Sequence, residues 1–99
     1  MIIRRSRRYT VKMADFETYS FGADVEMSHH DMGLSDDDVT KLSDEDYEAT
    51  KKDLTEHVLG ELNNQLHDEI YDAAELTTNQ KSFLLKAFGI KKTTTKRRI

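Results

Sequence analysis

The sequence predicts an α+β fold, in which an antiparallel β-hairpin packs on a long amphipathic helix that is followed by a short C-terminal helix. Apolar and polar residues alternate across 9–28 with the period of two that a half-buried strand requires. Across 44–75 the apolar residues instead recur at helical spacing and fall within one sector of a helix. The apolar face of the hairpin and the apolar stripe of the helix can bury each other, which gives a two-layer domain.

The predicted hairpin spans 9–28. Apolar residues alternate with polar ones from Tyr9 in its first strand and from Tyr19 in its second. The intervening residues 14–18 have the length of a hairpin loop. A lone hairpin is marginal in water and leaves two edges open, so pairing with the hairpin of a second copy would remove one edge from each. We therefore expect a homodimer.

An acidic connection over 29–42 is expected between the hairpin and the long helix, with one short helical turn at 36–42. The long helix itself is predicted over 44–75. Ser43 is its expected N-cap, because a serine hydroxyl accepts from the free backbone N–H groups of a first helical turn. Three carboxylates follow Ser43 directly, where the helix dipole favours anions.

A short helix is predicted over 78–88, with a capping signal before it and a glycine after it. The expected domain therefore spans 9–90. Residues 1–8 are rich in arginine, and residues 91–99 carry no core-forming pattern. They are predicted to be a basic N-terminal arm and a basic C-terminal tail.

Composition excludes several classes of protein. The chain of 99 residues contains no cysteine, which excludes disulfides, thiolate metal sites and a cysteine nucleophile. No apolar run approaches the roughly 20 residues that span a bilayer. The first residues lack the apolar core of a signal peptide. We expect a cytoplasmic protein that makes no use of a membrane.

Charge is sorted along the chain. Residues 13–90 hold all 19 Asp and Glu but five of the 15 Lys and Arg, a net charge of −14 against −4 for the whole chain. An acidic body attracts basic surfaces and repels nucleic acid. Such a surface can mimic a phosphate backbone and occupy the basic groove of a nucleic-acid-processing enzyme. The candidate partner-binding residues crowd into one short stretch: Asp36, Asp37, Asp38, Asp44, Glu45, Asp46 and Glu48.

Binding of single-stranded nucleic acid through the basic ends is the alternative function. Cationic side chains can neutralise phosphates, and Tyr9, which lies among them, can stack a base. The residues assigned to this alternative are Arg4, Arg5, Arg7, Arg8, Lys96, Arg97 and Arg98. A small virion or assembly subunit is a further alternative.

The sequence predicts neither a metal site nor catalysis. His29, His30 and Asp31 are neighbours, but adjacent histidines on a strand point to opposite sides, which suits a single ion poorly. The acidic run that follows lacks the ligand spacing and the central glycine of a calcium loop. The chain also lacks a glycine-rich phosphate loop and a nucleophile motif. We therefore expect a non-enzymatic protein without a cofactor.

Residues 8–19 read Arg-Tyr-Thr-Val-Lys-Met-Ala-Asp-Phe-Glu-Thr-Tyr, and an alternating second strand and an acidic helix follow them. Over about residues 8–75 this arrangement resembles small uncharacterised proteins of bacteriophages and other mobile elements, in which an aromatic-Glu-Ser/Thr turn joins two strands. The resemblance implies a hairpin-plus-helix fold and a viral setting in the host cytoplasm. Small phage proteins without catalytic motifs often act by binding host machinery, and by this analogy we expect an accessory protein that binds a host or phage protein as an inhibitor or regulator.

Overall fold

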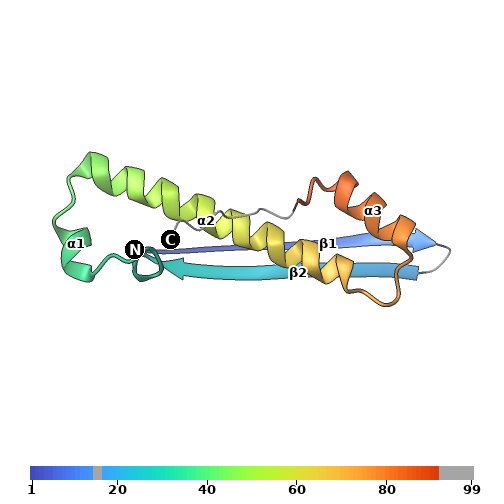
Figure 1. The fold of residues 1–99 in the computed structure, drawn as a ribbon. Helices are drawn as coiled ribbons and strands as arrows, with labels where there is room; N and C mark the ends of the chain where they lie inside the picture. The colour runs from blue at the N-terminus through green and yellow to red at the C-terminus, as the bar shows by residue number, and fades with distance from the viewer. Residues whose placement is uncertain (15–16, 92–99) are drawn as a thin grey trace.

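The structure is a computed structural model that describes residues 1–14 and 17–91, and it confirms the predicted α+β class (Figure 1). The molecule is elongated, with extents of 57 × 28 × 18 Å. The elements follow in the order β1 (Ile2–Ala14), β2 (Glu17–Ser28), a 3₁₀ helix η1 (His29–Met32), α1 (Asp36–Thr40), α2 (Asp44–Tyr71) and α3 (Thr78–Ala87).

The two strands form an antiparallel sheet in which Ile2 pairs with Ser28 and Tyr9 with Phe21. Across residues 2–12 and 18–28 the odd-numbered positions face α2 and most of their side chains are buried or half-buried, with Arg5 as the exposed exception, whereas most even-numbered residues are exposed. The hydrogen bond from the His29 N–H to the Met1 carbonyl, 3.1 Å long, continues this ladder past the end of β2. The hairpin is therefore a single long ribbon with one packed face.

The predicted free arm over 1–8 is wrong, because β1 begins at Ile2 and pairs with β2 from there onward. Its inward positions start with the buried Ile3 and continue with Arg5 and Arg7. Side chains in this segment point alternately to the two faces of the sheet, but residues 4–8 are polar on both faces, so the sequence shows no alternation of apolar and polar residues. The predicted loop is also too long, since the strands extend to Ala14 and resume at Glu17; residues 15–16 lie outside the described part of the chain.

The core lies between the sheet and α2, which runs along the inner face of the ribbon (Figure 1). From Leu54 onward every fourth residue of α2 is completely buried, as a stripe of this periodicity requires: Leu54, Val58, Leu62, Leu66 and Ile70. Opposite them lie the inward residues of the strands, Ile3, Tyr19, Phe21 and Val25. The predicted packing of the helix stripe on the hairpin face is thus confirmed.

The third helix closes the core at the hairpin-loop end of the ribbon (Figure 1). Leu84 and Ile90 join the buried cluster. The ring of Phe88 packs against Tyr9, with centroids 4.5 Å apart, and against Phe21 at 5.7 Å. This aromatic contact fixes the C-terminal end of the described chain to both strands.

Two predicted helix ends need correction. The long helix ends at Tyr71 rather than at residue 75, because Ala73 and Leu76 stay in the core as part of the following turn. The short helix ends at Ala87, with Phe88 as its C-cap. Of the predicted tail 91–99, residues 92–99 lie outside the described part. Among residues 1–14 and 17–91, none of the helices has the length and apolarity needed to cross a bilayer.

Candidate functional site

The segment between the sheet and α2 reverses direction through a capped 3₁₀ helix. The Ser28 hydroxyl accepts from the His30 N–H at 3.2 Å, and the Ser28 N–H donates to the Asp31 carboxylate at 2.7 Å. Gly33 ends η1 in the left-handed conformation, φ 81°, which glycine adopts without steric cost. The chain that follows Gly33 therefore turns back toward the histidines of η1.

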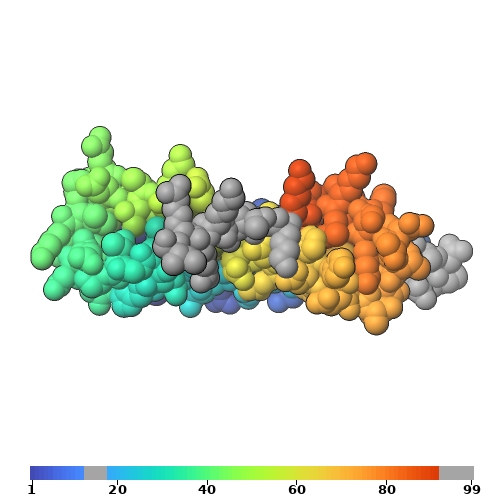
Figure 2. Space-filling model, in the orientation of Figure 1, coloured from blue at the N-terminus to red at the C-terminus, as the bar shows by residue number. Residues whose placement is uncertain are grey.

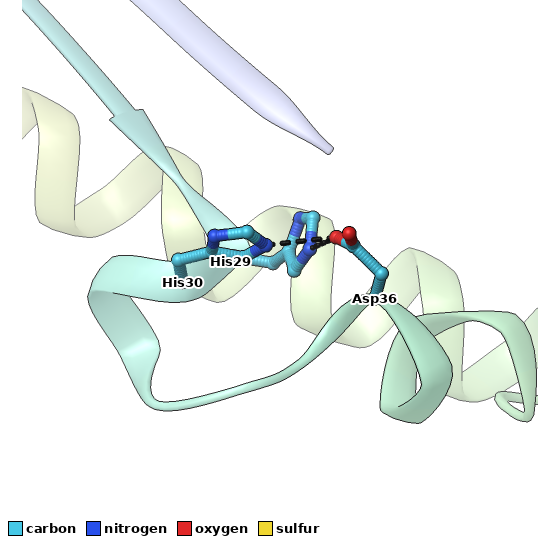
Figure 3. Close-up of side chains that lie close together, drawn as sticks. All are labelled: His29, His30 and Asp36. Atoms are coloured by element: carbon cyan, nitrogen blue, oxygen red, sulfur yellow. Dashed lines mark hydrogen bonds and ion pairs between the residues drawn. The ribbon is translucent and has the colours of Figure 1, made fainter.

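A second cap fixes the start of α1. The Ser35 hydroxyl accepts from the Asp38 N–H at 3.1 Å, and the Ser35 N–H donates to the Asp38 carboxylate at 2.9 Å. The bonds with the Ser35 backbone and hydroxyl lower the pKa of the Asp38 carboxyl. The Asp38 carboxylate therefore serves as part of the helix cap. Asp36, at the first position of α1, points toward η1 instead (Figure 3).

His29, His30 and Asp36 converge on one point, as Figure 3 shows. The Nε2 atoms of His29 and His30 lie 2.7 and 2.8 Å from the same carboxylate oxygen of Asp36. The two imidazole rings stand edge to face, with centroids 4.2 Å apart and planes at 88°. Hydrogen bonds from His30 and then His29 lower the pKa of the Asp36 carboxyl. These three side chains are named the His–His–Asp cluster below.

The His–His–Asp cluster has one buried side and one open side. The side chain of His29 is 9% exposed, whereas those of His30 and Asp36 are 59% and 80% exposed. The Nδ1 atom of His29 lies 3.2 Å from the Met1 carbonyl oxygen and 2.9 Å from the Met1 nitrogen. The cluster therefore ties the start of β1 to η1 and α1, and it opens to solvent past His30 and Asp36.

The expectation that the two histidines point to opposite sides is wrong, because they lie in a 3₁₀ helix and not on a strand. Successive residues of a 3₁₀ helix are about 120° apart rather than 180°, so both rings can swing toward one ligand. Two local signals in the sequence mark this turn. Ser28 followed by Asp31 is a capping box, and Gly33 is a helix terminator.

The seven carboxylates predicted to bind a partner lie on α1 and the first turns of α2, at one end of the elongated molecule (Figures 1 and 2). Two of them already have partners: Asp36 in the His–His–Asp cluster and Asp38 in its cap. The other five are exposed, and they are absent from the ion pairs within the described residues. We call these five the acidic end: Asp37, Asp44, Glu45, Asp46 and Glu48.

The arginines assigned to the nucleic-acid alternative are strand residues with separate environments. Arg4 forms an ion pair with Asp24 on the outer face, 3.2 Å long. The guanidinium of Arg5 donates to the Arg4 carbonyl at 2.9 Å. Arg7 is half-buried on the inner face, and Arg8 is exposed on the outer one. The four cations therefore do not form a flexible arm.

Tyr9, the residue expected to stack a base in that alternative, already packs against other rings. Tyr9 packs its ring against Phe88 and Phe21 in the core and is half-buried. It is therefore not free to stack a base. The remaining members of the assigned set, Lys96, Arg97 and Arg98, lie outside the described residues.

The fold and these surfaces define a small α+β domain with an acidic end beside a His–His–Asp cluster. Comparisons of the chain with protein-family models, with curated proteins and with solved structures found no match. The chemistry of the exposed side chains is therefore the basis on which a function can be assigned.

Proposed function

We propose that this protein works by binding and that its acidic end engages a basic surface of a partner protein. The observation that supports the proposal is a group of five exposed carboxylates at one end of the molecule that share no ion pair within residues 1–14 and 17–91. Unpaired charge of one sign attracts the opposite charge over distances of about a Debye length, roughly 8–10 Å.

The helix dipole accounts for part of this charge. Asp44, Glu45 and Asp46 occupy the first turn of α2, where each anion is favoured by typically about 0.3–1 kcal/mol. Asp37 on α1 and Glu48 in the second turn of α2 lie outside that turn and still add to the same end. Repulsion among these carboxylates is relieved when a cationic surface approaches, and the attraction also speeds association.

A groove that normally holds a polyanion fits such a surface, because carboxylates and phosphates accept the same charge-assisted hydrogen bonds from Arg and Lys. Together with the resemblance to small bacteriophage proteins, this suggests a nucleic-acid-processing enzyme of host or phage as the partner. The protein would then act as its inhibitor or regulator by occupying the nucleic-acid groove.

The test compares two triple variants with the same change in charge. The first, Asp37→Lys/Glu45→Lys/Glu48→Lys, reverses the acidic end. The matched control, Glu56→Lys/Glu61→Lys/Glu75→Lys, reverses three exposed carboxylates elsewhere. Partners captured from bacterial lysate by the full-length protein are identified by mass spectrometry, purified and titrated by calorimetry.

We expect the first variant to lose tenfold or more in affinity and the control variant to change far less. Far-UV circular dichroism shows whether both variants keep the fold. An equal loss in the two variants would mean that only net charge matters. An unchanged affinity in the first variant would end the proposal.

A further inference from the structure

The His–His–Asp cluster presents the ligand set of a zinc site. One ligand atom from each of its three side chains lies within 4.8 Å of the other two. Two imidazole nitrogens and a carboxylate oxygen, completed by water, are ligands that Zn²⁺ takes at distances of about 2.0–2.2 Å. We infer that His29, His30 and Asp36 bind Zn²⁺.

The contacts require a small adjustment to admit the ion. Around a tetrahedral Zn²⁺, neighbouring nitrogen and oxygen ligands stand roughly 3.3 Å apart. The present separations between the Asp36 oxygen and the two Nε2 atoms are 2.7 and 2.8 Å. The carboxylate must therefore retreat by about half an ångström when Zn²⁺ replaces the shared hydrogen bonds. Asp36 and His30 are both exposed, so their side chains have room to move.

Met1 lies beside the far nitrogen of the buried ring. The Nδ1 atom of His29 lies 2.9 Å from the Met1 nitrogen and 3.2 Å from the Met1 carbonyl oxygen. A ligating histidine usually donates its second ring N–H to a carbonyl or carboxylate, which fixes the tautomer and turns the other nitrogen toward the metal. When Zn²⁺ takes Nε2, the proton of His29 moves to Nδ1, which then donates to the Met1 carbonyl in place of its contact with the Met1 nitrogen. The open side past His30 and Asp36 provides an entry path.

Apart from the Met1 ammonium group beside His29, the charged residues that adjoin the cluster in the sequence are acidic. The chain contains no Lys or Arg from Met13 to Thr40, and Asp31, Asp37 and Asp38 lie within two residues of a ligand. Carboxylates alone would attract any divalent ion, including Mg²⁺ and Ca²⁺, which prefer oxygen ligands. The two imidazoles favour Zn²⁺ over both of these ions. Selectivity between Zn²⁺ and Mg²⁺ therefore separates a built site from general acidic attraction.

The experiment titrates the full-length chain, without a polyhistidine tag, with ZnCl₂ alone in a calorimeter. We expect saturation at one Zn²⁺ per chain, a thermal midpoint that rises with Zn²⁺ because the ion binds the folded state, and neither effect with MgCl₂ at the same concentration. Co²⁺ in place of Zn²⁺ should gain the intense visible absorption of a tetrahedral ion, which hydrated octahedral Co²⁺ lacks.

The variants concern exposed residues, because replacement of the buried His29 would also disturb packing. His30→Ala and Asp36→Asn should each weaken Zn²⁺ binding tenfold or more while circular dichroism stays unchanged. The matched controls are His57→Ala, an exposed histidine on α2, and Asp37→Asn, the adjacent carboxylate. Both controls should weaken Zn²⁺ binding far less, because neither residue supplies a ligand atom.

Three results would overturn the inference. One is the absence of saturable Zn²⁺ binding by the unaltered chain. Another is Mg²⁺ binding as tight as Zn²⁺ binding, which assigns the effect to carboxylates alone. The third is an equal loss of affinity in His57→Ala and His30→Ala. None of these results bears on the acidic end, whose partner affinity is measured separately.

Discussion

The carboxylate of Glu69 on α2 accepts a hydrogen bond from the backbone N–H of Gly22, 3.4 Å away, at the outer edge of β2. That N–H points away from β1, because the ladder bonds belong to odd-numbered residues, as the bond from His29 to Met1 shows. A strand that added to this edge would need the same donor. Glu69 therefore protects the edge of β2 with a charged side chain.

The edge of β1 is protected in a related way. The Arg5 guanidinium donates a hydrogen bond to the Arg4 carbonyl oxygen, which an added strand would need as an acceptor. Charged side chains at sheet edges oppose the addition of a further strand. Pairing of two hairpins is the route by which we predict a homodimer. That pairing would have to displace one of these two contacts, and the homodimer stays a prediction.

Removal of the Glu69 carboxylate should leave the Gly22 N–H accessible to water. We expect Glu69→Ala to speed hydrogen exchange of the Gly22 amide roughly two- to tenfold, the range that one modest hydrogen bond gives. Glu69→Gln keeps an acceptor oxygen and should change the rate little. NMR exchange measures both, with Glu61→Ala, an exposed change further up α2, as the control. A Gly22 rate that is the same with and without the carboxylate contradicts the contact.

Gly22 is also a position where the backbones come close. A Cβ atom there would stand 2.8 Å from the Arg7 carbonyl oxygen and 2.8 Å from Cγ of Arg8. The first of these atoms belongs to the backbone and cannot move without disturbing the sheet. We expect Gly22→Ala to lower the free energy of unfolding by about 1–3 kcal/mol. Glu26→Ala, at an exposed position of the same strand face, should stay within about 0.5 kcal/mol, and urea unfolding compares the two.

The stripe of α2 should carry most of the stability. Leu62 is completely buried, and Leu59, three residues earlier, is half-buried. We expect Leu62→Ala to lower the free energy of unfolding by about 2–5 kcal/mol through lost burial and a cavity. Leu59→Ala should cost clearly less. Equal losses at the two positions, measured by urea unfolding, would argue against the observed facing of α2.

Hydropathy could predict the sheet only where its inward residues are apolar. Tyr19, Phe21 and Val25 are buried and alternate with polar residues, a pattern that predicts a strand. In the first eight residues the inward positions after Ile3 are Arg5 and Arg7. An arginine can cover apolar surface with its aliphatic stem while its charge stays in water, so the sequence of this strand resembles a basic arm.

Of the two candidate sites, local sequence signals predict one, whereas the other depends on the folded backbone. The acidic end follows from local signals, because Ser35 and Ser43 cap the two helices that carry it. The His–His–Asp cluster depends on the reversal at Gly33 and on the position of His29 beside Met1. Contacts that join residues across a reversal depend on backbone geometry, which spacing in the sequence does not determine.

The reversal at Gly33 can be tested directly. Its φ of 81° lies in the left-handed region, and a Cβ atom there would meet nothing within 4 Å. The cost of a side chain is therefore that of the backbone conformation, about 1–2 kcal/mol for alanine. We expect Gly33→Ala to lower the free energy of unfolding by about this amount, and Gly33→Asn to lower it less, because asparagine tolerates this conformation. If alanine and asparagine prove equally costly in urea unfolding, the left-handed turn is not the cause.

The ion pair of Arg4 and Asp24 on the outer sheet face predicts a pH dependence. The hydrogen bond from Arg4 is the main cause that lowers the pKa of the Asp24 carboxyl. A carboxyl with a lowered pKa in the folded state stabilises the fold above its unfolded pKa, about 3.9. That contribution is lost as the pH falls through the folded value. It should be small, because the two side chains are 66% and 43% exposed.

Arg4→Ala should therefore raise the Asp24 midpoint in an NMR titration of its carboxyl carbon, toward the ordinary value for aspartate. The rise should be incomplete, since Ser6 and Arg8 also lower the pKa of this carboxyl. Arg5→Ala removes the neighbouring cation, whose guanidinium contacts the Arg4 carbonyl instead, and should leave the Asp24 midpoint in place. A midpoint that shifts equally in both variants would show that general positive charge on β1, and not the paired guanidinium, holds the Asp24 carboxylate ionised.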